Sequence, residues 1–234
     1  MPLVTFQQID HLGEIVIDRP PQNLFSGELL TDLRTAATSA VATKFLAREQ
    51  VKVLGVFGTG RQARAHIKVI PRVRRFEQVL VCGRDAEASR NFAQRMSAET
   101  ALPVAAADAR TCAAESDVLC TCTSSHTPLF DGNLLRAGVH LNLVGTFQSH
   151  AREVDSTTVQ RARVFVESYE GAPAEAGDLL IPMQEGVIGQ THVAGDLHEL
   201  TSGKKQGRRG ADEITLFKSV GYALEDLATA ELLA

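Results

Sequence analysis

Hydrophobic positions along the chain alternate between two spacings. Short apolar runs bounded by turn residues predict buried strands near residues 51–57, 78–82, 103–107, 117–122, 139–144 and 163–167. Apolar positions three or four residues apart predict helices between them, near residues 61–72, 86–99, 108–115, 132–136 and 155–162. Because strands and helices alternate at this spacing, the sequence predicts the α/β class. The expected core is a doubly wound parallel sheet of six strands with right-handed crossovers.

The residues before the first of these strands follow another pattern. Two short extended segments are predicted near residues 3–9 and 14–18. The pair Pro20-Pro21 then breaks the chain, and an alanine-rich helix is predicted for residues 26–48.

The pattern changes again after residue 168. Residues 173–186 and 197–202 are predicted to be helical, and residues 203–210 form a basic, glycine-rich loop. A last strand and turn are predicted for residues 213–221, followed by a closing helix over residues 222–233.

The turn after the first predicted sheet strand carries the pattern Gly-x-Gly-x-x-Ala, which is typical of a Rossmann dinucleotide site. Gly58 permits the tight turn, Gly60 lets the backbone approach a pyrophosphate, and Ala63 lets the following helix pack closely. Arg61 and Gln62 begin that helix, whose first N–H groups and positive dipole end favour phosphate. The sequence therefore predicts cofactor binding at these five residues. The alternative is a glycine turn shaped only for packing.

The end of the second predicted strand bears on the choice of cofactor. An acidic residue there binds the ribose hydroxyl of NAD, whereas a small residue followed by Arg suits the 2′-phosphate of NADP. Here the strand is followed by Gly83 and Arg84, so NADP(H) is favoured and NAD(H) is the alternative. Asp85 leaves the choice between NADP(H) and NAD(H) open, because its carboxylate either contacts the ribose or caps the next helix.

Two later turns are placed at carboxyl ends of predicted strands, where open α/β sheets bind ligands. We expect Thr123 and Ser124 in the first turn to contact the cofactor, and Val144, Gly145 and Thr146 in the second. Gly145 is expected to permit close approach on the nicotinamide side. Val220, near the last predicted turn, completes the expected cofactor site. Ordinary turn chemistry is the alternative for both turns.

Composition narrows the functional classes. The 234 residues are 44% apolar and 22% charged, as in a globular enzyme. The net charge of −4 predicts no nucleic-acid or membrane partner, and no apolar run reaches the ~18 residues of a membrane span. Because the first residues lack a signal-peptide pattern, a cytoplasmic protein is expected. Cys120 and Cys122 have neither zinc-site spacing nor a histidine pair, so the four cysteines are expected to be reduced thiols and no metal site is predicted.

Four motifs occur in order, at residues 30–37, 58–63, 140–145 and 212–228, and together they resemble the ornithine cyclodeaminase / mu-crystallin family. The resemblance covers the chain from about residue 26 onward. It implies NAD(P)(H) chemistry on small amino or imino acids. It also implies a homodimer built through a separate substrate domain.

The resemblance assigns one substrate-binding residue and raises a doubt about one activity. It implies that Arg34 grips the substrate carboxylate, which suits the planar donor fork of a guanidinium. A structural ion pair is the alternative. The cyclodeaminase type has an Asp where this chain has Phe147, and Phe can neither accept a proton nor pair with an ammonium. Phe147, followed by Arg152-Glu153, is closer to ketimine-reductase-like relatives.

The resemblance also implies a division into domains. Because the family's substrate domain begins well before residue 1 of this chain, residues 1–48 are expected to be a remnant of the substrate/dimerisation domain with its linking helix. Residues 49–212 are expected to form the NAD(P)-binding Rossmann domain. Residues 213–234 are expected to return towards the substrate domain as a C-terminal helix. The expected architecture is thus a Rossmann domain with a truncated substrate domain.

The favoured function is an NAD(P)H-dependent reductase of small cyclic imino acids, acting on a CH–NH or C=N group. A homodimer is expected if the substrate domain is present. Ornithine cyclodeaminase or alanine dehydrogenase activity is one alternative, and a non-catalytic, NADPH-binding, mu-crystallin-like protein is another. No proton donor stands out among His126, His150 and Glu153.

Overall fold

The computed structural model describes residues 4–9, 12–17, 27–171, 175–222 and 225. The two extended segments expected at the start pair as an antiparallel hairpin of β1 (Val4–Ile9) and β2 (Leu12–Ile17). The expected alanine-rich helix is α1 (Gly27–Leu46).

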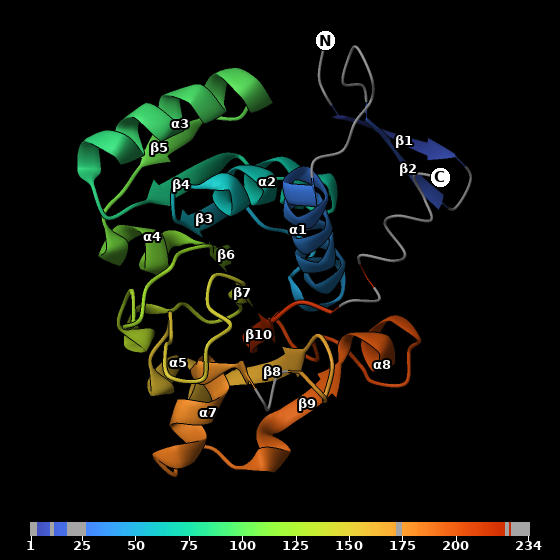
Figure 1. The fold of residues 1–234 in the computed structure, drawn as a ribbon, viewed down its shortest axis with the longest axis vertical. Helices are drawn as coiled ribbons and strands as arrows, with labels where there is room; N and C mark the ends of the chain where they lie inside the picture. Colours follow the sequence, from blue (N-terminus) through green and yellow to red (C-terminus); the bar gives the residue numbers. More distant parts are fainter. Residues whose placement is uncertain (1–3, 10–11, 18–26, 172–174, 223–224, 226–234) are drawn as a thin grey trace.

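Eight parallel strands form the main sheet. In chain order they are β3 (Val53–Phe57), β4 (Gln78–Cys82), β5 (Val104–Ala106), β6 (Val118–Thr121), β7 (His140–Leu143), β8 (Ala162–Val166), β9 (Val193–Asp196) and β10 (Ile214–Lys218). Their spatial order is β5-β4-β3-β6-β7-β10-β8-β9, which Figure 1 shows from top to bottom. The predicted α/β class and parallel sheet are confirmed.

The crossovers between these strands contain the other helices whose bounds the described residues give. They are α2 (Arg61–Val69), α3 (Ala86–Thr100), α4 (Ala109–Glu115), α5 (Ser156–Arg161), α7 (Gly177–Gln184) and α8 (Leu197–Thr201), with 3-10 turns η1 (Ile70–Arg72), η2 (Gly132–Leu134) and η3 (Gln190–His192). The helix predicted over residues 132–136 is wrong, because only the short turn η2 forms there. Except for residues 222 and 225, the predicted closing helix lies outside the described residues.

The sheet is larger than predicted, and its order corrects one domain boundary. The sequence pattern predicts six strands for the sheet and a last strand within residues 213–221, and it misses β9, a short strand whose residues include the small Ala194 and Gly195. The last strand, β10, lies between β7 and β8 and pairs with both. A boundary after residue 212 is therefore wrong, because the sheet includes residues 214–218. Hydrophobic periodicity identifies a strand but does not select its neighbours.

Helices cover both faces of the sheet and enclose separate cores. On one face, α2 and α3 pack over β3 and β4, and α1 packs along α2 and across β7 and β10. The other face carries α4, α5 and α7, which enclose the largest apolar cluster. Figure 1 shows α1 on one side of the strands and α4 and α5 on the other.

Two neutral histidines lie under α1. His66 Nδ1 donates to the Gln62 carbonyl at 2.8 Å, and its Nε2 accepts from the Ser39 hydroxyl at 2.9 Å. His140 in β7 lies 3.2 Å from the Asn142 side-chain oxygen and 3.1 Å from the Thr215 hydroxyl. Burial lowers the pKa of His66 to about 4 and that of His140 to about 3. Both imidazoles are therefore neutral at pH 7.

Acidification is expected to destabilise the protein through these two imidazoles. Below the ordinary pKa of 6.5 the unfolded chain takes up their protons, whereas the folded chain stays neutral down to about pH 4. The free energy of unfolding should fall by up to about 1.4 kcal/mol per pH unit for each histidine. Urea denaturation at pH 7, 6 and 5 measures this slope, and His66→Gln should make it shallower. Equal slopes for the two proteins would contradict the assignment.

Candidate functional site

A cavity of about 570 Å³ opens at the carboxyl ends of the central strands. Residues from α1 and from the segments after β3, β6, β7 and β10 line it. They are Asp32, Arg34, Thr35, Gly60, Arg61, Gln62, Cys122, Thr123, Ser124, Val144, Gly145, Phe147, Ser219, Val220 and Gly221. The cavity lies where the chain leaves the adjacent strands β3 and β6 in opposite directions, the position at which open α/β sheets bind ligands.

The glycine turn after β3 forms one wall of the cavity. Gly58 has φ of +115°, and a Cβ on it would lie 2.5 Å from the Cys122 carbonyl oxygen, so the turn requires glycine. Gly60 differs, because a Cβ there would meet no protein atom within 4 Å. Ala63 does not line the cavity. It is fully buried between α2 and β3, as its predicted packing role requires. The space beside Gly60 is therefore open to a bound ligand.

Asp32 of α1 holds the beginning of α2. Its carboxylate pairs with Arg61 at 3.5 Å and accepts a hydrogen bond from Gln62 Nε2 at 3.0 Å. The first turn of α2 has no acidic residue, and its N-cap, Gly60, provides no side-chain cap. Neither an acidic residue of the first turn nor a side-chain cap therefore competes with an anion at this helix end. Sequence reasoning missed Asp32, although it lies in the same motif as Arg34.

The loops after β6 and β7 touch one another across the cavity wall. A Cβ on Gly145 would lie 2.1 Å from the Thr123 carbonyl oxygen and 2.4 Å from its nitrogen. Glycine is required here because the two loops are in contact, and the expected approach of Gly145 to a nicotinamide stays a prediction. Thr146 is buried beside the cavity, and its hydroxyl donates to the Ser125 carbonyl at 3.1 Å.

The end of β4 lies outside the cavity lining. Arg84 is exposed there. Asp85 caps α3, and its carboxylate accepts from the Ala88 N–H at 2.7 Å. The helix-cap alternative for Asp85 is therefore confirmed.

Arg34 reaches the cavity beside two carboxyl groups. Its guanidinium lies 3.4 Å from Glu225, and the two side chains are 11% and 18% exposed. Burial, together with the neighbouring Glu167, raises the pKa of Glu225 to about 8. Glu167 accepts from the Gly221 and Val220 N–H groups at 2.6 and 3.2 Å, which fixes the turn after β10 against the cavity.

The three residues considered as proton donors lie away from the cavity lining. His126 and His150 are exposed, with ring centroids 5.9 Å apart in an edge-to-face pair. Glu153 is fully buried. Among the described residues, the structure thus brings none of the three to the cavity surface.

All four cysteines are free thiols, as expected. Cys122 lines the cavity, and burial raises its pKa well above the ordinary value, which makes it a poor nucleophile. Within the described residues no cluster of histidine, cysteine and acidic side chains has the makings of a metal site. None of the described helices is both long and apolar enough to span a membrane.

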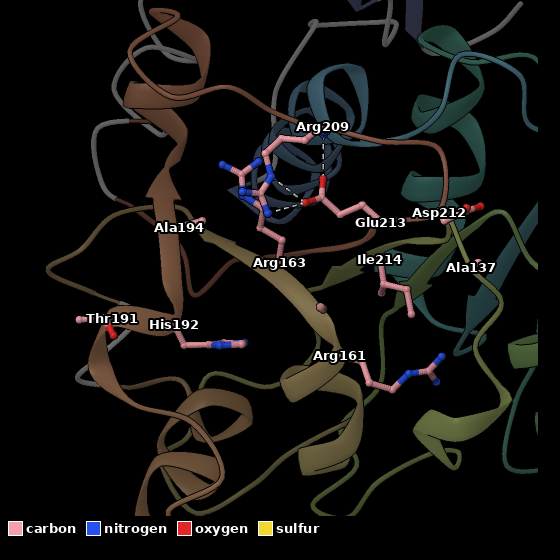
Figure 2. Close-up of a pocket in the computed structure, with 11 residues that line it drawn as sticks. Ala137, Arg161, Arg163, Thr191, His192, Ala194, Arg209, Asp212, Glu213 and Ile214 are labelled. Atoms are coloured by element: carbon pink, nitrogen blue, oxygen red, sulfur yellow. Dashed lines mark hydrogen bonds and ion pairs between the residues drawn. The ribbon is translucent and has the colours of Figure 1, made fainter.

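A second hollow of about 760 Å³ lies at the opposite, amino-terminal edge of the sheet (Figure 2). Most of its charged side chains are engaged with the protein. Arg209 pairs with Glu213 at 2.9 Å, and Arg161 donates to the carbonyls of Gly132 and Leu135. His192 lies 2.8 Å from the Val159 carbonyl. We therefore place the candidate site at the smaller cavity, where most of the sequence-predicted residues converge.

The sheet order and the cavity at its switch point define a Rossmann-like α/β protein. The model of the ornithine cyclodeaminase/mu-crystallin family matches residues 19–234. The chain belongs to this family.

Named relatives are similar over most of the chain. A Delta(1)-pyrroline-2-carboxylate reductase of Bacillus cereus is 39% identical over 215 residues, which are 91% of this chain and 66% of that protein. The solved Thermococcus litoralis Delta(1)-pyrroline-2-carboxylate reductase, in complex with NADH and L-proline, is 39% identical with a TM-score of 0.86. The match covers 94% of this chain and 70% of that one.

A third relative acts on a different compound. The iminosuccinate reductase of Paracoccus denitrificans, solved with NAD+, is 32% identical with a TM-score of 0.83 over 97% of this chain and 70% of that one. This chain spans about two thirds of the length of the curated reductases that it matches.

Proposed function

We propose that this chain carries the cofactor half of a nicotinamide-dinucleotide-dependent reductase of small cyclic imino acids, such as Δ1-pyrroline-2-carboxylate. One observation carries the proposal: a single cavity is lined by the glycine turn, Arg34 and Phe147. The relatives named as Delta(1)-pyrroline-2-carboxylate reductases support this substrate class, and the iminosuccinate reductase supports the same bond type.

The residues present fit a dinucleotide. The open space at Gly60 and the N–H groups at the start of α2 suit a pyrophosphate. Thr123, Ser124, Val144 and Gly145 would then border the nicotinamide half, and Val220 would close the cavity on the β10 side. When bound, the cofactor supplies the hydride.

Arg34 and Phe147 would hold the imino acid. The guanidinium binds the substrate carboxylate through charge-assisted hydrogen bonds, while Glu225 holds the guanidinium in place. Phe147 is 59% exposed at the cavity and offers an apolar surface to a ring. Because Phe147 neither accepts a proton nor binds an ammonium, we propose that the site does not cyclise ornithine.

Conversion of several compounds tests the proposed reaction. We expect NADPH or NADH oxidation with Δ1-pyrroline-2-carboxylate and Δ1-piperideine-2-carboxylate, and no formation of proline from ornithine. Proline from ornithine would favour cyclodeaminase chemistry, and turnover of pyruvate with ammonia would favour an alanine dehydrogenase.

A non-catalytic, mu-crystallin-like nucleotide-binding protein is the second candidate. The observation that favours it is the length of the match, because the chain covers only about two thirds of the curated reductases. Cofactor binding without turnover of any of these compounds would support this candidate. A homodimer and a cytoplasmic location remain predictions that follow from the family and the sequence.

For the cofactor, we propose a preference for NADP(H) over NAD(H). Arg84 follows β4 and is exposed, and Asp85 is engaged as a helix cap, so a cation rather than a carboxylate is available at this strand end. The complexes of relatives with NADH and NAD+ support the alternative, which is use of NAD(H).

Replacement of Arg84 by alanine separates the two cofactors. We expect Arg84→Ala to weaken NADPH binding by roughly tenfold, because it removes a phosphate contact, and to leave NADH binding unchanged. Fluorescence titration with each nucleotide measures both affinities, and Arg90→Ala on the exposed side of α3 is the control. An unchanged ratio of the two affinities would contradict the NADP(H) preference.

A further inference from the structure

Glu153 lies buried between the two strand-end loops that form one side of the cavity. Its Oε1 accepts hydrogen bonds from the Thr123 N–H at 2.8 Å and the Thr123 hydroxyl at 2.7 Å. Its Oε2 accepts from the Gly145 N–H at 2.8 Å and the Thr121 hydroxyl at 2.7 Å. The Glu153 carboxylate therefore joins the loop after β6 to the loop after β7. Thr123 and Gly145, the residues that it holds in these loops, both line the cavity.

An internal ion pair lies next to this carboxylate. Lys218, the last residue of β10, pairs with Asp178 of α7 at 3.0 Å, and both side chains are fully buried. Lys218 also donates to the Thr146 carbonyl. Asp178 accepts from the backbone N–H of Glu153 at 2.7 Å. Glu153, Lys218 and Asp178 thus form one buried charge cluster. This cluster also fixes Thr146, which precedes Phe147, and the start of the turn after β10.

The charges of the cluster are interdependent. Burial raises the pKa of Glu153, and the positive charge of Lys218 opposes that shift. Two carboxylates and one ammonium, all without solvent contact, are tolerated because backbone and hydroxyl donors surround the carboxylates, and the Asp178 carboxylate and the Thr146 carbonyl face the ammonium. Removing one of these charged groups leaves the charges of the other two buried without their full compensation.

We infer that Glu153, held by Lys218 and Asp178, is a positioning residue for the nicotinamide and substrate half of the site. The inference rests on the proposed function. The adenosine ribose belongs at the end of β4, so the loops after β6 and β7 face the nicotinamide half. Glu153 sets the separation of these loops. It does not line the cavity, and protein donors surround both of its oxygens, so it is not placed to donate a proton to a substrate.

The geometry requires a carboxylate rather than an amide. Each Glu153 oxygen faces two donors, and the side chain donates to none of them. An amide NH₂ in place of either oxygen would face a backbone N–H, of Thr123 or of Gly145, and lose that bond, because an N–H only donates, whereas the threonine hydroxyl can turn to accept. Glu153→Gln keeps the volume of the side chain and is therefore expected to move a loop without opening a cavity.

Glu153→Gln tests the inference when NADH affinity, emission of bound NADH and kcat are measured together. We expect the dissociation constant for NADH to stay within about threefold, because the glycine turn is untouched, and kcat to fall about tenfold to hundredfold through misplacement. The emission maximum of bound NADH should shift, because its nicotinamide reports the loop geometry. Thr121→Val removes a single Glu153 hydrogen bond outside the cavity and should act in the same direction with a smaller effect.

Val164→Ala in the core of β8 is the control for lost stability alone. It should lower the unfolding midpoint and leave kcat and the NADH emission unchanged. If Glu153→Gln and Thr121→Val also leave both kcat and the emission of bound NADH unchanged, the inference is overturned. If Glu153→Gln does not fold, Thr121→Val decides. A parent chain that binds NADH but reduces no imino acid would contradict the proposed reaction, and the emission of the variants would still test the positioning role.

Discussion

Replacing Gly60 with alanine is expected to abolish useful dinucleotide binding while the fold stays intact. Gly60 has φ −91° and ψ −166°, which alanine also adopts, and the added methyl would meet no protein atom within 4 Å. The methyl would instead occupy the space proposed for the pyrophosphate. We expect the dissociation constant for NADH and NADPH to rise by roughly a hundredfold, since the phosphates would be pushed off the helix N-terminus. Fluorescence titration measures the affinity, and thermal unfolding measures the stability.

The neighbouring glycine gives the matched control. Gly58→Ala places a methyl 2.5 Å from the Cys122 carbonyl oxygen at φ +115°, so it should destabilise the fold by on the order of 3 kcal/mol. Gly60→Ala should change the free energy of unfolding by less than about 1 kcal/mol. Parental nucleotide affinity in Gly60→Ala would refute the proposed position of the pyrophosphate.

Replacing Arg34 with methionine is expected to impair use of the imino acid and to spare the cofactor. The substitution keeps most of the side-chain length and removes the guanidinium that faces the cavity. We expect kcat/KM for Δ1-pyrroline-2-carboxylate to fall by roughly 10²–10³-fold, as for loss of a charge-assisted carboxylate contact. NADH affinity should stay within about threefold, because the dinucleotide occupies the glycine-turn side of the cavity.

Arg64→Met is the matched control for Arg34→Met. Arg64 lies on α2 and pairs with Glu99 at 3.0 Å on the surface, outside the cavity lining. Its removal should leave kcat/KM unchanged. Arg34 also pairs with Glu225, so the unfolding midpoint of Arg34→Met must be measured beside its kinetics. If both variants retain parental kcat/KM, Arg34 is not the carboxylate ligand.

Much of the candidate site was predictable because local sequence and sheet geometry act together. Strands that end in glycine or hydroxyl residues must present those residues at one edge of a parallel sheet. Gly60, Thr123 and Gly145 follow this rule and line the same cavity. The glycine pattern also specifies its own conformation, because Gly58 lies in a backbone region that other residues rarely adopt.

Other parts of the site depended on contacts between distant segments. Glu153 lies 30 residues or more from Thr121 and Thr123 in the sequence, and nothing near it indicates that it binds their loops. Asp32 meets Gln62 only because α1 packs along α2. Position 145 requires glycine because the loop after β6 lies against it. The residues next to Gly145 in the sequence do not indicate this contact.

By itself the sequence determined the α/β class, the strand that carries the glycine turn, and the resemblance that assigns Arg34 and Phe147. The class and the strand follow from periodicity and from turn chemistry, which act over a few residues, and the resemblance rests on four motifs that occur in order along the chain. Only the tertiary structure decided that β10 enters the sheet between β7 and β8, and that Lys218, Asp178 and Glu153 form one buried cluster. The physical reason is that strand order and charge burial depend on which distant surfaces pack together, and this is a property of the whole folded chain.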